Sequence, residues 1–196
     1  MTVASATQLD ARSEAYLAEV LRAIDSSVTV VEAYLLGSGA GGPFDPQTSD
    51  IDVVVVVARP FEDSERERFL GQLSELDCPA RDLELVVYVQ GSQPPDFELN
   101  VNEGEERPDE EAFWFVLDAA VAQERAVPVW DERPWVQLFE SIAPERIRSA
   151  IAESLAWSER QPRDDEFARL NAVRARHYLA RGEWISKAEA REEAGR

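Results

Sequence analysis

Apolar and polar positions alternate along the first half of the chain in two distinct periods. Apolar residues at every third or fourth position predict amphipathic helices over residues 10–25 and 64–76. Runs of β-branched and apolar residues predict three strands, over residues 28–36, 51–58 and 83–89. The second run is almost entirely valine, which is typical of a strand that is covered on both faces in the middle of a sheet.

The pattern becomes helical in the second half. Residues 93–108 are polar and predict irregular structure, and residues 127–129 predict a short strand or a linker. The spacing of apolar residues predicts helices over 110–121, 135–142, 144–160 and 165–181, and Ser186 with Glu189 predicts the start of a last short helix. The chain is therefore a mixed α/β half followed by a helical half, and we expect two domains, residues 1–142 and 143–196.

The charge of the chain narrows the class of partner. There are 39 acidic and 20 basic residues, and the formal net charge is −19. This argues against nucleic acid and anionic membrane, because both attract net positive charge. It favours cationic partners such as metal ions, polyamines and amino sugars, although solubility alone also explains it. A single cysteine excludes an intrachain disulfide, and no apolar run approaches the roughly 20 residues of a membrane helix. We expect a cytoplasmic monomer.

A glycine-rich segment follows the first predicted strand and allows two interpretations. Gly37, Gly39 and Gly42 match the G-x-G-x-x-G spacing of dinucleotide-binding proteins. That motif requires a helix to begin at once, so that its N-terminus faces the pyrophosphate. Pro43 and Pro46 argue against a long helix here.

The second interpretation rests on the acidic pair that follows. Asp50 and Asp52 flank Ile51 at the start of the valine strand. Because residues two apart in a strand point to the same face, the two carboxylates converge while Ile51 enters the core. Glu84 lies on the next predicted strand, and if the two strands adjoin it completes a triad of metal ligands. Carboxylates together with substrate phosphates are what Mg²⁺ prefers. A simple turn at the start of the strand is the alternative for an isolated Asp-x-Asp.

With Gly37-Ser38, then Ser49-Asp50-Ile51-Asp52, then Glu84, the chain resembles the DNA polymerase β-like nucleotidyltransferase superfamily. Within it, the likeness is strongest to the streptomycin/spectinomycin adenylyltransferases, which modify hydroxyls of aminoglycosides. It extends from about residue 34 to 187, and includes residues 113–118, 170–174 and 182–187. The resemblance implies an α+β fold: an N-terminal nucleotidyltransferase domain with a mixed β-sheet flanked by helices, followed by a C-terminal α-helical domain that is shortened.

The resemblance also implies roles for single residues. Asp50 and Asp52 match Mg²⁺ ligands, and Glu84 matches the general base that acts on the sugar hydroxyl. The implied nucleotide-binding residues are Gly37, Ser38, Ser49, Arg174 and Lys187. Trp157, Asp164 and Asp165 fall where the family contacts the aminoglycoside. From the residues alone, a structural carboxylate is the alternative partner of Arg174, and core packing is the alternative role of Trp157.

The acidic stretch over residues 98–111 is a separate candidate for the substrate. It contains Glu103 among seven acidic residues, opposed only by Arg107. Either it is a solvated loop, or it forms an acidic lip for a cationic substrate. The family carries a substrate-contacting tryptophan in this region, and Gly104 stands at the corresponding position of this chain.

The implied function is transfer of AMP from ATP to a hydroxyl of a streptomycin- or spectinomycin-like antibiotic, with release of pyrophosphate. Mg²⁺ is the implied cofactor, and antibiotic resistance is the implied consequence. Two alternatives stay open. One is a nucleotidyltransferase that modifies a protein or an RNA, as antitoxins of this superfamily do. The other is a non-catalytic aminoglycoside-binding module with the same fold.

Overall fold

The computed structural model describes residues 7–131 and 133–195, so residues 1–6 of the predicted first domain lie outside it. The chain packs into two compact units. The first comprises Met1–Glu110 and Ala122–Glu140, and the second comprises Glu111–Val121 and Ser141–Arg196. Helix α4 (Ala112–Arg125) contributes residues to both. The domain boundary after residue 142 stays a prediction; by packing, the first ten residues of α4 belong with the C-terminal helices.

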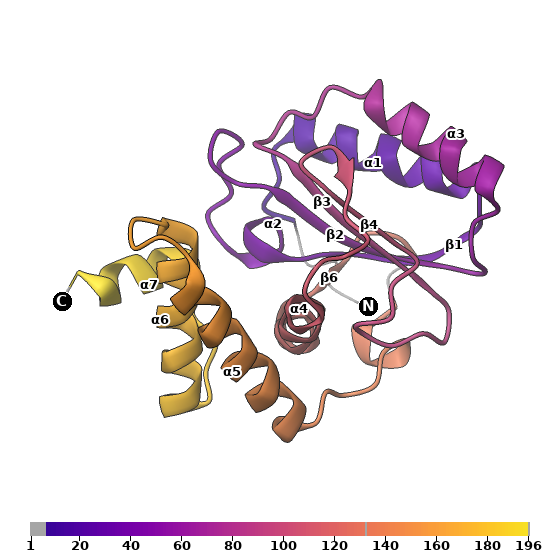
Figure 1. The fold of residues 1–196 in the computed structure, drawn as a ribbon. Helices are drawn as coiled ribbons and strands as arrows, with labels where there is room; N and C mark the ends of the chain where they lie inside the picture. Colours follow the sequence, from indigo (N-terminus) through magenta and orange to yellow (C-terminus); the bar gives the residue numbers. More distant parts are fainter. Residues whose placement is uncertain (1–6, 132, 196) are drawn as a thin grey trace, which may run out of the picture. The chain divides into compact units, whose positions relative to one another are not determined.

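A six-stranded mixed sheet forms the centre of the first unit, in the order β5-β4-β3-β2-β1-β6 (Figure 1). The strands are β1 (Val30–Leu35), β2 (Ile51–Val57), β3 (Leu83–Val89), β4 (Leu99–Asn102), β5 (Glu105–Glu106) and β6 (Val127–Pro128). β2 pairs with β3 in parallel and with β1 in antiparallel orientation. The valine strand is therefore internal, as predicted, and each of its valines is at most 5% exposed.

Two helices cover one face of this sheet. α1 (Ala11–Asp25) and α3 (Asp63–Ser74) lie side by side there, while α2 (Gly37–Gly41) is a single short turn between β1 and β2 (Figure 1). The core between the helices and the sheet contains the odd-numbered residues 51–57 of β2 and 83–87 of β3. Because strand residues alternate between faces, the even-numbered residues point to the opposite face. This alternation decides where Asp52 and Glu84 project.

The second unit consists of helices, in agreement with the fold class predicted from the sequence. They are α5 (Pro144–Arg160), α6 (Glu166–Arg181) and α7 (Lys187–Ala194), together with the first part of α4. Ile151 and Trp184 lie in its core. The helix ends follow the signals expected from the sequence: Pro144 is the first residue of α5, and Gly182, with φ of 73°, ends α6. Among the described residues, no helix combines the length and apolar character that crossing a membrane requires.

The expectation of irregular structure over residues 93–108 is wrong in part. Residues 99–106 form a β-hairpin at the edge of the sheet, in which Asn102 pairs with Glu105. The two loop residues, Glu103 and Gly104, have φ of 54° and 69°. A two-residue hairpin loop of type I′ requires positive φ at both positions, and a glycine in the second is its usual signal. Leu99 and Val101 alternate with polar residues, but the strand is too short for this alternation to stand out.

The helix predicted over residues 135–142 is also wrong. Only one 3₁₀ turn forms there, η1 (Trp135–Gln137). The helical spacing came from Trp135 and Phe139, whose rings stack on each other with centroids 4.3 Å apart. Trp135 also lies edge-on to Tyr34 at 5.1 Å. Phe139 lies edge-on to Tyr88 of β3 at 5.3 Å. The two rings therefore pack against β1 and β3 from a single turn, and the segment does not need a longer helix.

A buried carboxylate on β1 makes the stability of the first unit depend on pH. Glu32 is fully buried, and its two oxygens accept hydrogen bonds from the backbone N–H of Ala33, at 3.0 Å, and of Arg133, at 2.7 Å. Burial raises the pKa of Glu32 above its ordinary 4.5. The folded protein therefore holds a proton that the unfolded chain releases. The stability that this proton contributes is complete below pH 4.5, and it is lost as the pH rises through the raised pKa of Glu32.

We expect Glu32→Gln to remove this pH dependence. Gln cannot ionise, but it replaces one acceptor oxygen by a donor, at a cost of about 1–3 kcal/mol. The variant is therefore less stable at low pH, and its deficit relative to the wild type shrinks as the pH rises from 4.5. Urea unfolding of both proteins at several pH values measures the difference. Parallel profiles would show that folding does not raise the pKa of Glu32.

Candidate active site

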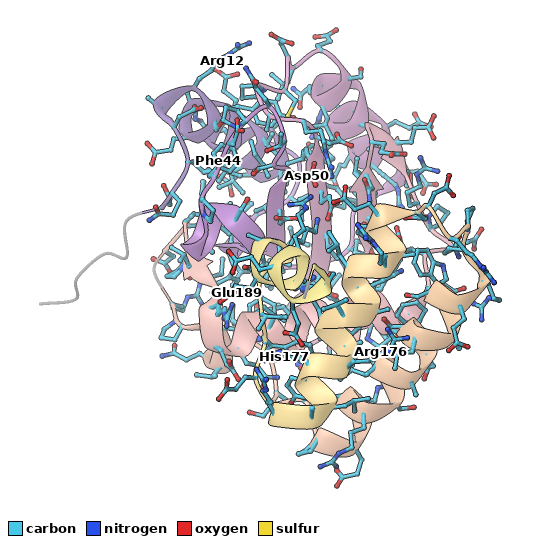
Figure 2. All side chains as sticks on the ribbon, turned by 90° about the vertical axis from the view of Figure 1, so that its left-hand side faces the viewer. Arg12, Phe44, Asp50, Arg176, His177 and Glu189 are labelled. Carbon is cyan, nitrogen blue, oxygen red and sulfur yellow. The ribbon has the colours of Figure 1, made fainter. Side chains whose placement is uncertain are left out.

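The acidic pair at the start of β2 meets the acid of β3 at one end of the sheet. The parallel register places Asp52 directly opposite Glu84. Asp50, which is labelled in Figure 2, immediately precedes β2. Each of the three side chains offers a carboxylate oxygen, and these oxygens lie within 4.8 Å of one another. The adjoining strands that the sequence argument required are present, so the structure brings the predicted triad together.

The three carboxylates differ in their exposure to solvent. Asp50 is buried, at 5% exposed, whereas Asp52 and Glu84 are half-buried. Ile51, between the two aspartates, is fully buried in the core beneath α1 and α3. Three like charges at this separation repel one another, and a cation relieves the repulsion. All three potential metal ligands are hard carboxylate oxygens, and solvent reaches those of Asp52 and Glu84. This set therefore fits a Mg²⁺ ion that also binds a substrate phosphate.

The backbone of the glycine-rich segment passes directly beside this triad. Leu36 donates its N–H to the Asp52 carbonyl at 2.8 Å. The next residue, Gly37, has φ of 55°, and a Cβ at this position would lie only 1.9 Å from Asp52 Oδ2. Only glycine allows this close approach. Gly37 and, following it in α2, Ser38 are therefore next to the acidic residues with which the resemblance groups them.

Ser49 has a local structural role. Its hydroxyl accepts a hydrogen bond from the Asp45 N–H at 3.2 Å, within the turn that precedes β2. Its carbonyl accepts from the Arg81 N–H at 3.1 Å. Ser49 thus links the turn to the segment before β3, and both contacts help to fix the position of the adjoining Asp50. A contact of Ser49 with the nucleotide stays a prediction.

Arg81 is the residue of this site that sequence reasoning missed. Its Nε donates to Asp50 Oδ1 at 2.7 Å, and its Nη2 donates to Asp50 Oδ2. These bonds raise the pKa of Arg81 above its ordinary value. Arg81 is 31 residues from Asp50 in sequence, and only the pairing of the segments before β2 and β3 brings them together. A basic residue just before an acidic strand was the available signal.

The second unit contains the other nucleotide residues that the resemblance implies. Arg174 on α6 is half-buried, and its Nε donates to the Ile185 carbonyl at 2.9 Å. Lys187 is exposed at the start of α7, with its Nζ 5.5 Å from the centre of the Phe167 ring. Neighbouring residues on α6 differ in role: His177 is buried and bonded to Glu193 at 2.8 Å, whereas Arg176 is exposed (Figure 2).

Trp157 belongs to an aromatic cluster in the second unit. Its ring lies 5.3 Å from Trp114 and 6.1 Å from Phe167, in edge-on geometry. Phe167 is 48% exposed, so the cluster is not closed off from solvent. Asp165 is the N-cap of α6, where its carboxylate accepts from the Ala168 N–H at 2.9 Å, and Asp164 is exposed. Asp165 thus has a structural role whether or not it binds substrate.

Glu103 lies in the β4–β5 loop, on the wall of an open cavity of about 520 Å³. Since Leu85 pairs with Val101 in antiparallel register, the end of β4 lies at the same end of the sheet as Glu84. The other residues lining this cavity are Asn102, Glu106, Arg107, Pro108, Asp109 and Glu110. Four of the lining residues are acidic: Glu106 pairs with Arg66, and Glu103 accepts a hydrogen bond from Arg107 at 3.0 Å. The acidic stretch is therefore ordered at the sheet edge and is not a free loop.

Comparison with known proteins agrees with this geometry. A model of the nucleotidyltransferase domain matches residues 17–106, the span that contains Gly37 and the acidic triad. Curated proteins give no match. Among solved structures, the chain is similar to spectinomycin adenyltransferase AAD(9) from Enterococcus faecialis, solved with ATP and spectinomycin. The identity is 21% and the TM-score 0.76, over 91% of this chain and 79% of that one.

At this identity the structural likeness shows the fold, and the family model identifies the domain that carries the triad. Both agree with the resemblance that the sequence motifs indicated. Residues 17–106 therefore match the nucleotidyltransferase domain family, and the chain as a whole has a fold similar to that of spectinomycin adenyltransferase.

Proposed function

We propose that the protein transfers AMP from ATP to a hydroxyl of a streptomycin- or spectinomycin-like antibiotic and releases pyrophosphate. The observation that carries this proposal is the triad of Asp50, Asp52 and Glu84, with carboxylate oxygens within 4.8 Å of one another beside the Gly37 backbone. A related fold has been solved with ATP and spectinomycin, which supports the choice of both substrates.

In this proposal Asp50 and Asp52 hold the Mg²⁺ ion, with Glu84 close enough to join them. When bound, the ion supplies positive charge that stabilises the charge developing on the α-phosphate. Glu84 accepts the proton of the attacking hydroxyl, while the new bond from oxygen to the α-phosphorus forms and the bond to pyrophosphate breaks. As a carboxylate at the edge of the triad, half exposed to solvent, it can approach a hydroxyl of an incoming substrate.

The remaining site residues bind the two substrates. Gly37 allows the backbone to approach the phosphates, with Ser38 and Ser49 nearby. For Arg174 and Lys187 the resemblance alone supports a role in binding phosphate, to which both offer positive charge. An antibiotic that carries ammonium or guanidinium groups suits the acidic cavity that contains Glu103. Trp157 offers an aromatic surface for a sugar ring, and Asp164 and Asp165 offer carboxylates for its amino groups. The net charge of −19 favours the same class of substrate.

The test is pyrophosphate release from Mg-ATP with a panel of acceptors: spectinomycin, streptomycin and an aminoglycoside of different ring structure, such as kanamycin. We expect release with spectinomycin or streptomycin, and a product heavier than the antibiotic by one adenylyl group in mass spectrometry. A panel of nucleoside triphosphates in the same assay measures the preference for ATP.

Three outcomes would contradict the proposal. Adenylylation of a protein or an RNA without transfer to any antibiotic would indicate the antitoxin-like alternative. Antibiotic binding in calorimetry, without binding of Mg-ATP, would indicate a sequestering module. Release of pyrophosphate only with kanamycin would retain adenylyl transfer but reject the substrate class.

A further inference from the structure

We propose that Arg81 is an exchangeable counter-ion of Asp50, which competes with the divalent cation and makes metal binding depend on the nucleotide. The inference rests on the metal site of the proposed function. It concerns a residue to which the resemblance assigns no role. The guanidinium occupies both oxygens of Asp50, through Nε to Oδ1 at 2.7 Å and Nη2 to Oδ2.

The burial of the two partners is unequal, and this indicates which of them can move. The side chain of Asp50 is 4% exposed, whereas that of Arg81 is 56% exposed. A buried carboxylate requires a compensating charge, and Arg81 provides it before a metal ion is present. The backbone of Arg81 is held by its N–H bond to the Ser49 carbonyl at 3.1 Å, so only its side chain is free to turn outwards.

A guanidinium and a divalent cation on the same carboxylate repel each other. The positive charge of Arg81 also lies close enough to Asp52 and Glu84 for both to raise its pKa, so it acts on the whole triad. Metal alone must displace Arg81 and gains little beyond what the guanidinium already provides. A metal ion that arrives with a nucleotide brings a triphosphate, and the displaced guanidinium can pair with this anion. Arg81 thus favours binding of the metal–nucleotide complex over binding of free metal.

Arg81→Gln tests the exchange in the absence of turnover. With Mn²⁺ as a paramagnetic probe for the metal, electron paramagnetic resonance measures the dissociation constant of the free protein. We expect Arg81→Gln to bind Mn²⁺ about tenfold more tightly than the wild type, because a competing charge is removed. In calorimetry with Mg²⁺ and a non-hydrolysable analogue of ATP, we expect Arg81→Gln to bind the nucleotide more weakly than the wild type. Arg81→Lys retains the charge without the bidentate geometry. Its affinity for Mn²⁺ should lie between those of the wild type and Arg81→Gln.

Thermal unfolding gives a second readout that also reveals misfolding. Without metal, Arg81→Gln leaves Asp50 buried and unpaired, so we expect a lower melting temperature than the wild type and a larger rise on addition of Mg²⁺. The matched control is Arg59→Gln, which removes another bidentate pair of the same unit, with Glu65 at 2.7 and 2.8 Å. It should leave the Mn²⁺ affinity unchanged.

Each outcome decides between the inference and the proposed function. Unchanged or weaker Mn²⁺ binding by Arg81→Gln, with binding abolished in Asp52→Asn, would overturn the exchange but retain the metal site. Mn²⁺ binding that is insensitive to Asp52→Asn would overturn the metal site itself, and the exchange with it. Tighter Mn²⁺ binding together with unchanged nucleotide affinity would overturn the dependence of metal binding on the nucleotide.

Discussion

Asp52→Asn is expected to lower the rate of adenylyl transfer by roughly 10³-fold or more, while the protein stays folded. Asn has the shape of Asp but lacks its charge, so the triad loses one of its two proposed principal metal ligands. Asp52 is half-buried, and its removal as a charge relieves repulsion within the triad. We therefore expect unchanged or slightly higher stability in urea unfolding, together with a loss of metal binding and of pyrophosphate release.

Asp82→Asn is the matched control for this variant. Asp82 is the acidic residue just before β3, two positions from Glu84, and its Oδ1 accepts from the Leu83 N–H at 2.7 Å. Asn preserves this acceptor, so the control removes one nearby charge without touching the triad. We expect its activity to stay within a few-fold of the wild type. Equal losses in Asp52→Asn and Asp82→Asn would show that net charge near β3, not metal ligation by the triad, governs the rate.

The second large effect is expected from a single methyl group. Gly37→Ala places a Cβ 1.9 Å from Asp52 Oδ2, at a residue whose φ is 55°. An L-residue at this φ costs about 1–2 kcal/mol, and the contact in addition forces the carboxylate out of its position. A displacement of about 1 Å at a reacting centre can reduce the rate by about 10²-fold. We expect a loss of that order in kcat/KM, with a fall in stability of at least about 1–2 kcal/mol.

Gly41→Ala provides the comparison within the same short helix. A Cβ at Gly41 meets no atom within 4 Å, and its φ is outside the left-handed region. We expect activity and unfolding free energy close to those of the wild type. If Gly37→Ala retained the activity of Gly41→Ala, the close approach of the backbone to Asp52 would have no part in catalysis.

The triad was predictable because it depends on two local rules. Alternation along β2 placed Asp50 and Asp52 on one face of the strand. Alternation along β3 placed Glu84 on the face opposite to Leu83 and Leu85. Only the adjacency and the register of the two strands had to be assumed, and the structure pairs Asp52 with Glu84 directly. The internal position of β2 followed from its valines in the same way, because a strand without polar alternation has no solvent-facing side.

What escaped prediction depends on contacts between distant segments. The bond of Arg81 to Asp50 joins residues 31 positions apart, and no pattern in the sequence specifies which acid a basic residue will meet. Trp135 and Phe139 have helical spacing but owe it to aromatic stacking. The hairpin at Glu103 and Gly104 carried a turn signal, but the many charges around it indicated a loop. Tertiary packing overrode local propensity in each case.

Helix α4 limits how this chain can be divided or recombined. Its first part contributes Phe113, Val116 and Ala120 to the cores of the helical unit, although these residues precede the C-terminal helices by more than twenty positions. A fragment that begins at residue 143 therefore leaves part of its own interior behind, and we expect it to be poorly packed when expressed alone. Exchange of the helical half between relatives would have to transfer residues 111–121 as well. The helical unit is therefore built from two separate segments of the sequence, Glu111–Val121 and Ser141–Arg196, which pack together.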